Sequence, residues 1–227
     1  MKKRTTIRIS AFLLCLCCAF FTSCKEDDGK GYVFGYDIPS NPGSLDPQYA
    51  SDRESYLIIG SVFEGLFRIG ADGNAEKAMA ESYTVSDDGL TYNFKLKQDR
   101  YWTDVNGYNK KVTAADFVFG FRRLFLPETR APKASEYFCI KNSDKINSGE
   151  ITDLSQLGVT AQGDYSLTIE LQYTEPSFAM LLAMPAAMPC NEEYFIKAQG
   201  KYGLDAERTA SNLSLIHISE PTRRYAI

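Results

Sequence analysis

The side chains that usually carry enzyme chemistry are scarce in this 227-residue sequence. Histidine occurs once, as His217 in the C-terminal segment 213–227. If that segment is not native, a Ser-His-Asp triad, a Cys-His pair and a His-containing zinc site are all excluded. The glycine-rich patterns Gly-x-x-x-x-Gly-Lys-Ser/Thr and Gly-x-Gly-x-x-Gly do not occur, which removes the usual signal for nucleotide binding. Lysine, aspartate and glutamate remain, but no pair of them stands out. We expect no catalytic residue, no metal site and no cofactor.

Residues 1–23 have the pattern of a lipoprotein signal peptide. A basic start is followed by an apolar run over 9–21, which is shorter than the about 20 apolar residues that span a membrane. Phe21-Thr22-Ser23-Cys24 resembles a bacterial lipobox, with Phe where Leu is usual. We expect an exported protein, lipid-anchored through Cys24 on the outer face of the cytoplasmic membrane, with residues 24–31 as a flexible tether. An ordinary signal peptide with incidental cysteines is the alternative.

Beyond Cys24 only two cysteines follow, Cys139 and Cys190. Two cysteines cannot frame a small disulfide-rich fold. Export permits a disulfide between them, but the Cα separation that the bond requires cannot be read from a sequence, so the pairing stays open.

The body of the chain is acidic. Of the 29 acidic residues, 28 lie within residues 24–212, whereas six of the 25 basic residues lie in the two end segments. An acidic surface repels phosphates, so we expect no nucleic-acid partner.

Residues 213–227 continue no pattern of the preceding chain. The string Leu-Ser-Leu-Ile-His-Ile-Ser-Glu-Pro-Thr-Arg-Arg-Tyr-Ala-Ile resembles the translation of a sequencing-adapter read, so we expect an artefactual tail and a native chain cut off near Asn212. A genuine C-terminal segment is the alternative.

Hydrophobic periodicity predicts a mixture of helices and strands. Ser51-Asp52-Arg53-Glu54 has the form of a capping box at the start of a helix over about 52–64. Thr113-Ala114-Ala115-Asp116 begins a second helix, which Pro127 stops. The other expected elements are strands at 32–36, 92–96 and 167–171, turns at 86–89 and 104–107, and helical stretches at 177–184 and 191–203. Without regular strand–helix alternation, this order favours an α/β or mixed α+β domain.

Five short strings occur in order and at fitting distances. They are Ser44-Leu45-Asp46-Pro47, Phe63-Glu64-Gly65-Leu66, Ala80-Glu81-Ser82-Tyr83 with the 86–92 segment, Trp102 with the 104–107 turn, and Thr113-Ala114-Ala115-Asp116-Phe117-Val118. Together they resemble the N-terminal portion of the family 5 extracellular solute-binding proteins, the oligopeptide- and dipeptide-binding components of ABC importers. The resemblance covers residues 32–212.

The resemblance implies the N-terminal lobe of a two-lobed periplasmic-binding-protein-like fold, here truncated, because a complete member is more than twice as long. In the family, two α/β lobes close over an extended peptide by a hinge motion. The peptide main chain is bound by strand-like hydrogen bonds, and its side chains lie in hydrated pockets. The implied partners are an oligopeptide, ABC permease and ATPase subunits, and the membrane through the lipid anchor.

The resemblance also implies ligand-binding residues. It places Ser51, Asp52 and Arg53 at a ligand-facing turn, where the first position can be an acid that meets the amino end of the ligand. Ser51 departs from this, and it could instead be only a helix N-cap. Lys133 occupies a cleft position that the family often fills with Tyr. A lysine there could pair with a ligand carboxylate or simply be exposed.

Other functions remain open at this point. The same fold could bind a metal chelate, haem or an oligosaccharide. The chain could belong to a surface lipoprotein hydrolase whose catalytic residues lie elsewhere, or to a sensing or adhesion lipoprotein without a transporter.

We expect residues 24–227 alone to aggregate or to fold only in part, and to show no measurable peptide affinity, because returning strands would be missing and sheet edges would stay open. Size-exclusion chromatography, denaturant unfolding and peptide titration check this expectation. Clean two-state unfolding of a monomer would contradict it.

Overall fold

The computed structural model describes residues 37–103, 109–199 and 202–203. All of them except Asp37 belong to the second of two compact units, residues 38–227. Several predictions concern segments outside the described residues and stay predictions: the signal peptide 1–23, the tether 24–31 with Cys24, the strand 32–36, the turn 104–107 and the tail 213–227.

A four-stranded antiparallel sheet in the order β3-β4-β8-β7 is the largest strand assembly of the described residues. Its strands are β3 (Ala80–Val85), β4 (Thr91–Leu96), β7 (Val159–Ala161) and β8 (Ser166–Glu170). Two antiparallel ribbons pair β1 (Phe67–Ile69) with β2 (Ala75–Lys77), and β5 (Tyr101–Thr103) with β6 (Asn109–Lys111).

The helices of the described residues are mostly short. The α-helices are α2 (Arg53–Val62), α3 (Ala114–Phe125), α4 (Ser143–Asn147), α5 (Phe178–Leu181) and α6 (Glu192–Lys197). The 3-10 helices are η1 (Pro127–Thr129), η2 (Ala134–Tyr137), η3 (Leu154–Gln156) and η4 (Pro185–Ala187). None of the helices in the described ranges combines the length and the apolar character that a membrane crossing requires.

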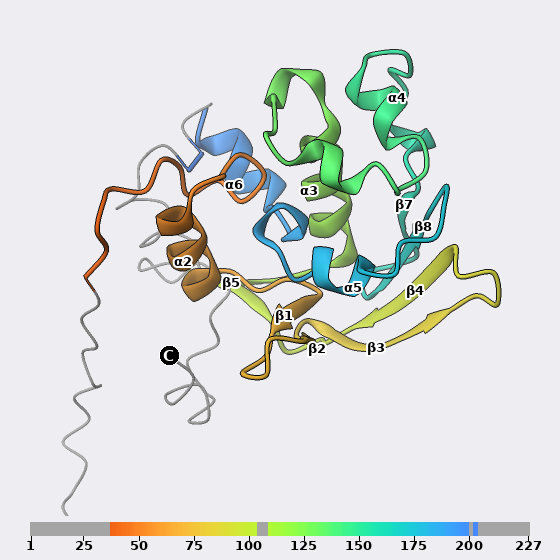
Figure 1. Cartoon of the computed structure of the whole chain (residues 1–227), viewed down its shortest axis with the longest axis horizontal. Coiled ribbons are helices and arrows are strands. Elements are labelled where there is room, and N and C mark those ends of the chain that lie inside the picture. Colours follow the sequence, from red (N-terminus) through yellow and green to blue (C-terminus); the bar gives the residue numbers. More distant parts are fainter. Residues whose placement is uncertain (1–36, 104–108, 200–201, 204–227) are drawn as a thin grey trace, which may run out of the picture. The chain divides into compact units, whose positions relative to one another are not determined.

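The β3–β4 hairpin follows from the predicted strand and turn. Along β4, buried Phe94 alternates with exposed Asn93 and Lys95, as the sequence pattern predicts. At the turn, Gly89 has φ +72°, which favours glycine, and its N–H donates to the Ser86 carbonyl at 2.8 Å. Helices α3 and α5 lie on one side of this hairpin (Figure 1). The core therefore forms between that face and the helices.

Helix α3 confirms the second predicted helix. The backbone N–H of Thr113 donates to the Asp116 carboxylate at 2.8 Å, so the capping box forms. The buried face of the helix carries Phe117, Val118, Phe121, Leu124 and Phe125. The helix ends at Phe125, two residues before Pro127, because proline cannot continue the hydrogen-bond ladder.

Helix α2 confirms the first predicted helix but corrects its cap. The N-cap is Asp52, whose carboxylate accepts the N–H of Ser55 at 2.8 Å. Ser51 lies one residue before the cap, so the interpretation of Ser51 as the N-cap is wrong. A carboxylate at the cap also interacts favourably with the positive end of the helix dipole, which explains why the aspartate takes the position.

Three other stretches differ in extent from the predictions. The predicted helical stretch 177–184 contains only the single turn of α5, because Pro185 follows closely. The stretch 191–203 contains the short α6, capped by the Asn191 side chain, which accepts the Tyr194 N–H at 2.8 Å. Helix α4 was not predicted at all, since its segment is polar.

The disulfide between Cys139 and Cys190 is not formed. Both residues are free thiols, buried in different surroundings. The Cys139 carbonyl accepts the N–H of Gln172, just after β8, whereas the Cys190 sulfur accepts a hydrogen bond from Arg123 of α3 at 3.3 Å. Burial raises the pKa of Cys139 to about 11 and that of Cys190 to about 12, so both thiols stay protonated.

Replacement of Asp116 by alanine should lower the free energy of unfolding by about 1 kcal/mol, because the Thr113 N–H loses its acceptor at the start of α3. Burial is the largest influence on Asp116 and raises its pKa above the usual 3.8. Because the pKa of Asp116 is raised in the folded state, its protonation stabilises the folded protein most below pH 3.8. This contribution to the free energy of unfolding falls as the pH rises through the folded-state pKa. Urea unfolding should therefore give a larger difference between wild type and Asp116→Ala in mild acid than near neutral pH.

Asp164→Ala is the matched control, because the Asp164 side chain is exposed and makes no hydrogen bond within the described residues. This variant should change the free energy of unfolding by less than about 0.5 kcal/mol. Equal effects of the two variants would contradict the role of the capping box.

Candidate ligand-binding site

The loop of residues 43–55 carries the predicted turn and is closed by the Asp52 side chain. The Asp52 carboxylate accepts the Ser55 hydroxyl at 2.6 Å and the Gly43 N–H at 3.2 Å, besides the Ser55 N–H. Burial acts to raise the pKa of Asp52, but these hydrogen bonds outweigh it, and the pKa lies below its usual value. Asp52 is therefore ionised and already satisfied by the protein, and it holds the loop in shape.

Ser51 and Arg53 lie on either side of Asp52, and both are exposed. Among the described residues, the Arg53 guanidinium has no ion-pair partner. An exposed guanidinium beside a serine hydroxyl offers hydrogen-bond donors to a carboxylate or a peptide carbonyl. Of the three residues predicted at this turn, Ser51 and Arg53 are thus available to a ligand.

Lys133 lies immediately before η2 and is already paired. Its ammonium contacts the Glu136 carboxylate at 2.6 Å, and the lysine side chain is 33% exposed. The hydrogen bond from Lys133 to Glu136 is the main reason why the pKa of Lys133 is raised. A ligand carboxylate would share Lys133 with Glu136. The three-residue spacing of the two opposite charges was the available sequence signal for this pair.

Tyr56, which lies four residues after Asp52 on α2, is within electrostatic range of both Asp52 and Lys133. Burial is the main cause that raises the pKa of Tyr56, and the charges of Lys133, Glu136 and Asp52 all act on its hydroxyl. These charges therefore lie in one neighbourhood. Tyr56 is half-buried and packs against the hydrophobic core.

Tyr137, the last residue of η2, anchors this 3-10 helix in the core. Its side chain is fully buried, and its hydroxyl donates to the Leu181 carbonyl of α5 at 2.9 Å. A buried tyrosine with a satisfied hydroxyl is a rigid support. Lys133 and Glu136 are thus presented by a segment anchored in the core.

Beneath the 43–55 loop lies a buried guanidinium, that of Arg123 on α3. Its two terminal nitrogens donate to the Asp46 carboxylate at 3.1 and 2.5 Å, and one of them also donates to the Gln48 side chain at 2.7 Å. Arg123 is 4% exposed and Asp46 is 6% exposed. Sequence reasoning missed this pair, because Asp46 served only as part of a recognised string and Arg123 lies in the last turn of a helix.

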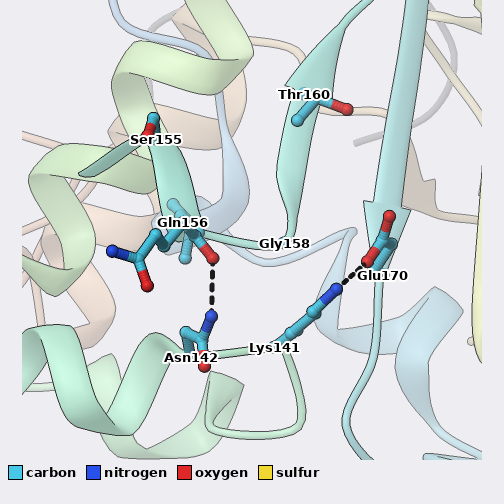
Figure 2. Close-up of a pocket in the computed structure, with 8 residues that line it drawn as sticks. Lys141, Asn142, Ser155, Gln156, Gly158, Thr160 and Glu170 are labelled. Atoms are coloured by element: carbon cyan, nitrogen blue, oxygen red, sulfur yellow. Dashed lines mark hydrogen bonds and ion pairs between the residues drawn. The ribbon is translucent and has the colours of Figure 1, made fainter. Parts of the chain in front are cut away.

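A hollow of about 280 Å³ opens elsewhere, beside α4, η3, β7 and β8 (Figure 2). Lys141 and Glu170 form an ion pair at 2.6 Å across it, and the Asn142 side chain donates to the Gln156 carbonyl at 2.8 Å. None of its lining residues is one of the four predicted ligand-binding residues. Its polar groups bond to one another, so the hollow carries no argument for the predicted site.

The described residues around α2 and η2 carry charged and polar groups at the surface. Within them, no group of three or more His, Cys, Asp or Glu side chains is arranged to hold a metal ion. There the charges of Asp52 and of the Lys133–Glu136 ion pair act on the half-buried Tyr56. Such groups can bind a polar ligand by charge and by hydrogen bonds.

Comparisons with known proteins identify the family of the chain. The sequence profile of the bacterial extracellular solute-binding proteins, family 5 (Middle), matches residues 74–212. The chain is 34% identical over 208 residues to the "Dipeptide-binding protein" of Lactococcus lactis subsp. cremoris, covering 92% of this chain and 36% of that protein. It is 35% identical over 160 residues to the "Probable deoxycholate-binding periplasmic protein YgiS" of Escherichia coli, covering 69% of this chain and 29% of that protein.

A solved structure shows the same fold. The substrate-binding domain of an oligopeptide ABC transporter from Bacillus anthracis superposes with a TM-score of 0.70 at 37% identity, over 76% of this chain and 32% of that one. The chain spans about a third of the length of the proteins that it matches. Both the resemblance drawn from the short strings and the mixed α/β fold are confirmed. The chain therefore belongs to the bacterial extracellular solute-binding proteins of family 5, a family of transport proteins.

Proposed function

We propose that this chain is part of the substrate-binding component of an ABC importer, which captures oligopeptides outside the cytoplasm. One observation carries the proposal: most of the chain aligns with a dipeptide-binding relative, and its fold matches the substrate-binding domain of an oligopeptide transporter. The described residues are consistent with capture, because their exposed charges lie on a rigid scaffold. Permease and ATPase subunits are the partners that this function requires.

The turn Ser51–Arg53 and Lys133 are the proposed ligand contacts in this part of the protein. Arg53 would donate to a carboxylate or a main-chain carbonyl, and the Ser51 hydroxyl would donate or accept. Lys133 would add a cation whose charge Glu136 partly balances. Main-chain hydrogen bonds and bridging water would allow peptides of varied sequence to bind.

Acylation of Cys24 is the proposed means of attachment to the membrane. Each buried CH₂ of a lipid chain contributes roughly 0.8 kcal/mol, so two chains hold a protein stably. The apolar run and the lipobox-like string before Cys24 support this proposal. The tether 24–31 would then let the binding domain reach both ligand and permease.

Thermal unfolding of the protein expressed from its complete reading frame tests the proposed ligand class. A pool of peptides should raise the midpoint of unfolding, because a ligand that binds only the folded state stabilises it. Stabilisation by another solute with no response to any peptide pool would overturn the proposal.

A bile acid is a second candidate ligand, favoured only by the name of the Escherichia coli relative. Deoxycholate therefore belongs in the same experiment. If deoxycholate stabilises the protein at concentrations at which peptides do not, the second candidate replaces the first. Metal chelates, haem and oligosaccharides form further arms of the test.

Arg53→Ala and Lys133→Ala should each weaken binding of acidic peptides by about 3- to 10-fold, because each change removes one charge-assisted hydrogen bond. Lys133→Ala should weaken the binding of acidic peptides more than that of neutral peptides. Without Lys133, the Glu136 carboxylate has lost its ion-pair partner and repels an acidic ligand. Isothermal titration with matched acidic and neutral peptides checks both expectations.

Lys145→Ala is the control, since Lys145 is an exposed lysine on α4, and α4 and α2 lie on opposite sides of α3 (Figure 1). It should leave peptide affinity unchanged. An equal loss in all three variants would indicate a general effect of net charge and would contradict the assigned contacts.

A further inference from the structure

The buried Arg123 guanidinium lies directly beneath the loop that carries the proposed ligand contacts. Both of its terminal nitrogens are bound to the Asp46 carboxylate, which is 6% exposed. Removing a guanidinium and a carboxylate from water is costly, so such a pair persists only when its geometry is well satisfied. A two-pronged contact also fixes the orientation of the carboxylate, which a single hydrogen bond would not do.

Asp46 passes this constraint to the residues that follow it. Its carboxylate accepts the Gln48 N–H at 3.1 Å, and its carbonyl accepts the N–H groups of Tyr49 at 3.0 Å and Ala50 at 2.8 Å. One residue thus holds three consecutive amides in a tight turn. Ala50 is 2% exposed, and the next residue is the exposed Ser51. The direction of the chain at Ser51 is therefore set by the orientation of Asp46.

Gln48 makes a second link between Arg123 and the same turn. Its side-chain oxygen accepts a hydrogen bond from Arg123 at 2.7 Å, and its side-chain nitrogen donates to the Met188 carbonyl at 2.8 Å. Gln48 has no exposed surface. The turn is fixed on one side by α3 and on the other by the segment after η4.

Aromatic rings close the remaining faces of the guanidinium. Arg123 lies 4.1 Å from the ring centre of Phe195 and 5.2 Å from that of Tyr202. The Gly203 carbonyl accepts the Leu45 N–H at 2.8 Å. A Cβ atom at Gly203 would lie 2.1 Å from the Asp46 backbone nitrogen, so the approach of the two segments excludes any side chain there.

We infer that Arg123 is a positioning residue for ligand binding: through Asp46 and Gln48 it holds the 46–50 turn so that Ser51 and Arg53 face the ligand. The inference rests on the proposed function for the contact between this turn and a ligand. The ordering of the turn itself does not depend on that function. Arg123 touches no ligand in this assignment, because it is buried and both of its terminal nitrogens are bound by the protein.

A second buried ion pair supplies the matched control. Arg100 is 8% exposed and pairs at 3.3 Å with Glu64, which is 6% exposed. No hydrogen bond of the Arg100 side chain to the 43–55 loop occurs within the described residues. Arg100→Met and Arg123→Met remove the same charge and a similar volume from similarly buried sites, so both should lower stability, but only the second should loosen the turn.

Hydrogen exchange and peptide affinity, measured on the protein from its complete reading frame, test the inference. In Arg123→Met without ligand, the amides of Gln48, Tyr49 and Ala50 should exchange at least about tenfold faster than in Arg100→Met at equal global stability. Affinity for a peptide that binds wild type should fall about tenfold in Arg123→Met and stay within about twofold in Arg100→Met. Both measurements are made where unfolding curves show each variant to be folded.

Equal exchange of the three amides in the two variants would overturn the inference, because Arg123 would then act only on stability. A different outcome is that wild type binds no peptide while the three amides still exchange faster in Arg123→Met than in Arg100→Met. That result would support the ordering role of Arg123 but overturn the proposed function, so the two failures are distinguishable. If Arg123→Met does not fold, Arg123→Lys takes its place, since it keeps the positive charge but cannot make the two-pronged contact with the Asp46 carboxylate. Faster exchange at Tyr49 and Ala50 in that variant supports the inference, and unchanged exchange overturns it.

Discussion

The burial of one guanidinium constrains most of the described unit. The terminal nitrogens of Arg123 find acceptors, and its planar group finds aromatic rings, on segments more than 60 residues away from it in sequence: Asp46 and Gln48 before the sheet, and Cys190, Phe195 and Tyr202 after it. A hydrophobic contact tolerates sliding, but a two-pronged ion pair in a medium of low polarity does not. The loop, helix α3 and the last described segment are consequently held in a single relative arrangement. A neutral core of equal volume could be as stable. The contribution of the ion pair here is therefore to fix the relative positions of the segments that it joins.

A rigid scaffold beneath an exposed turn suits a protein that binds ligands. Binding weakens when a loop must be ordered first, so residues already fixed before the ligand arrives give higher affinity for the same contacts. At this turn, Asp52 closes the loop from outside and the Arg123–Asp46 pair holds it from inside. Neither carboxylate is left over for a ligand. Ser51 and Arg53, which the loop does not use internally, are the groups that remain exposed.

Helix caps, helix ends and strand alternation could be predicted from the sequence, whereas side-chain partners far apart in the chain could not. The cap of α3, its end before Pro127 and the alternation along β4 each depend on residues within a few positions of one another, so all three were predicted correctly. The cap of α2 was misplaced by one residue, because serine and aspartate are both good N-caps and the choice depends on Gly43, which lies nine residues away. Arg123 had the pattern of a surface cation in a last helical turn. Its burial depends on Asp46, 77 positions earlier in the chain. Hydrophobic periodicity cannot predict a partner at that distance.

The ligand contacts assigned by resemblance, the turn Ser51–Arg53 and Lys133, stay a prediction. In the structure, the charges of Asp52 and Lys133 both act on the Tyr56 hydroxyl. Glu136 was missed, yet it changes what Lys133 can do, since an ion pair presents a dipole to a ligand where a lone lysine presents a full charge. At Lys133, the proposed site would discriminate less between charged and neutral ligands than a lone lysine would, because any carboxylate must compete with Glu136 for the same ammonium. Weak discrimination by charge, on a turn whose backbone is tightly held, is the combination expected of a protein that reads the peptide main chain and tolerates varied side chains.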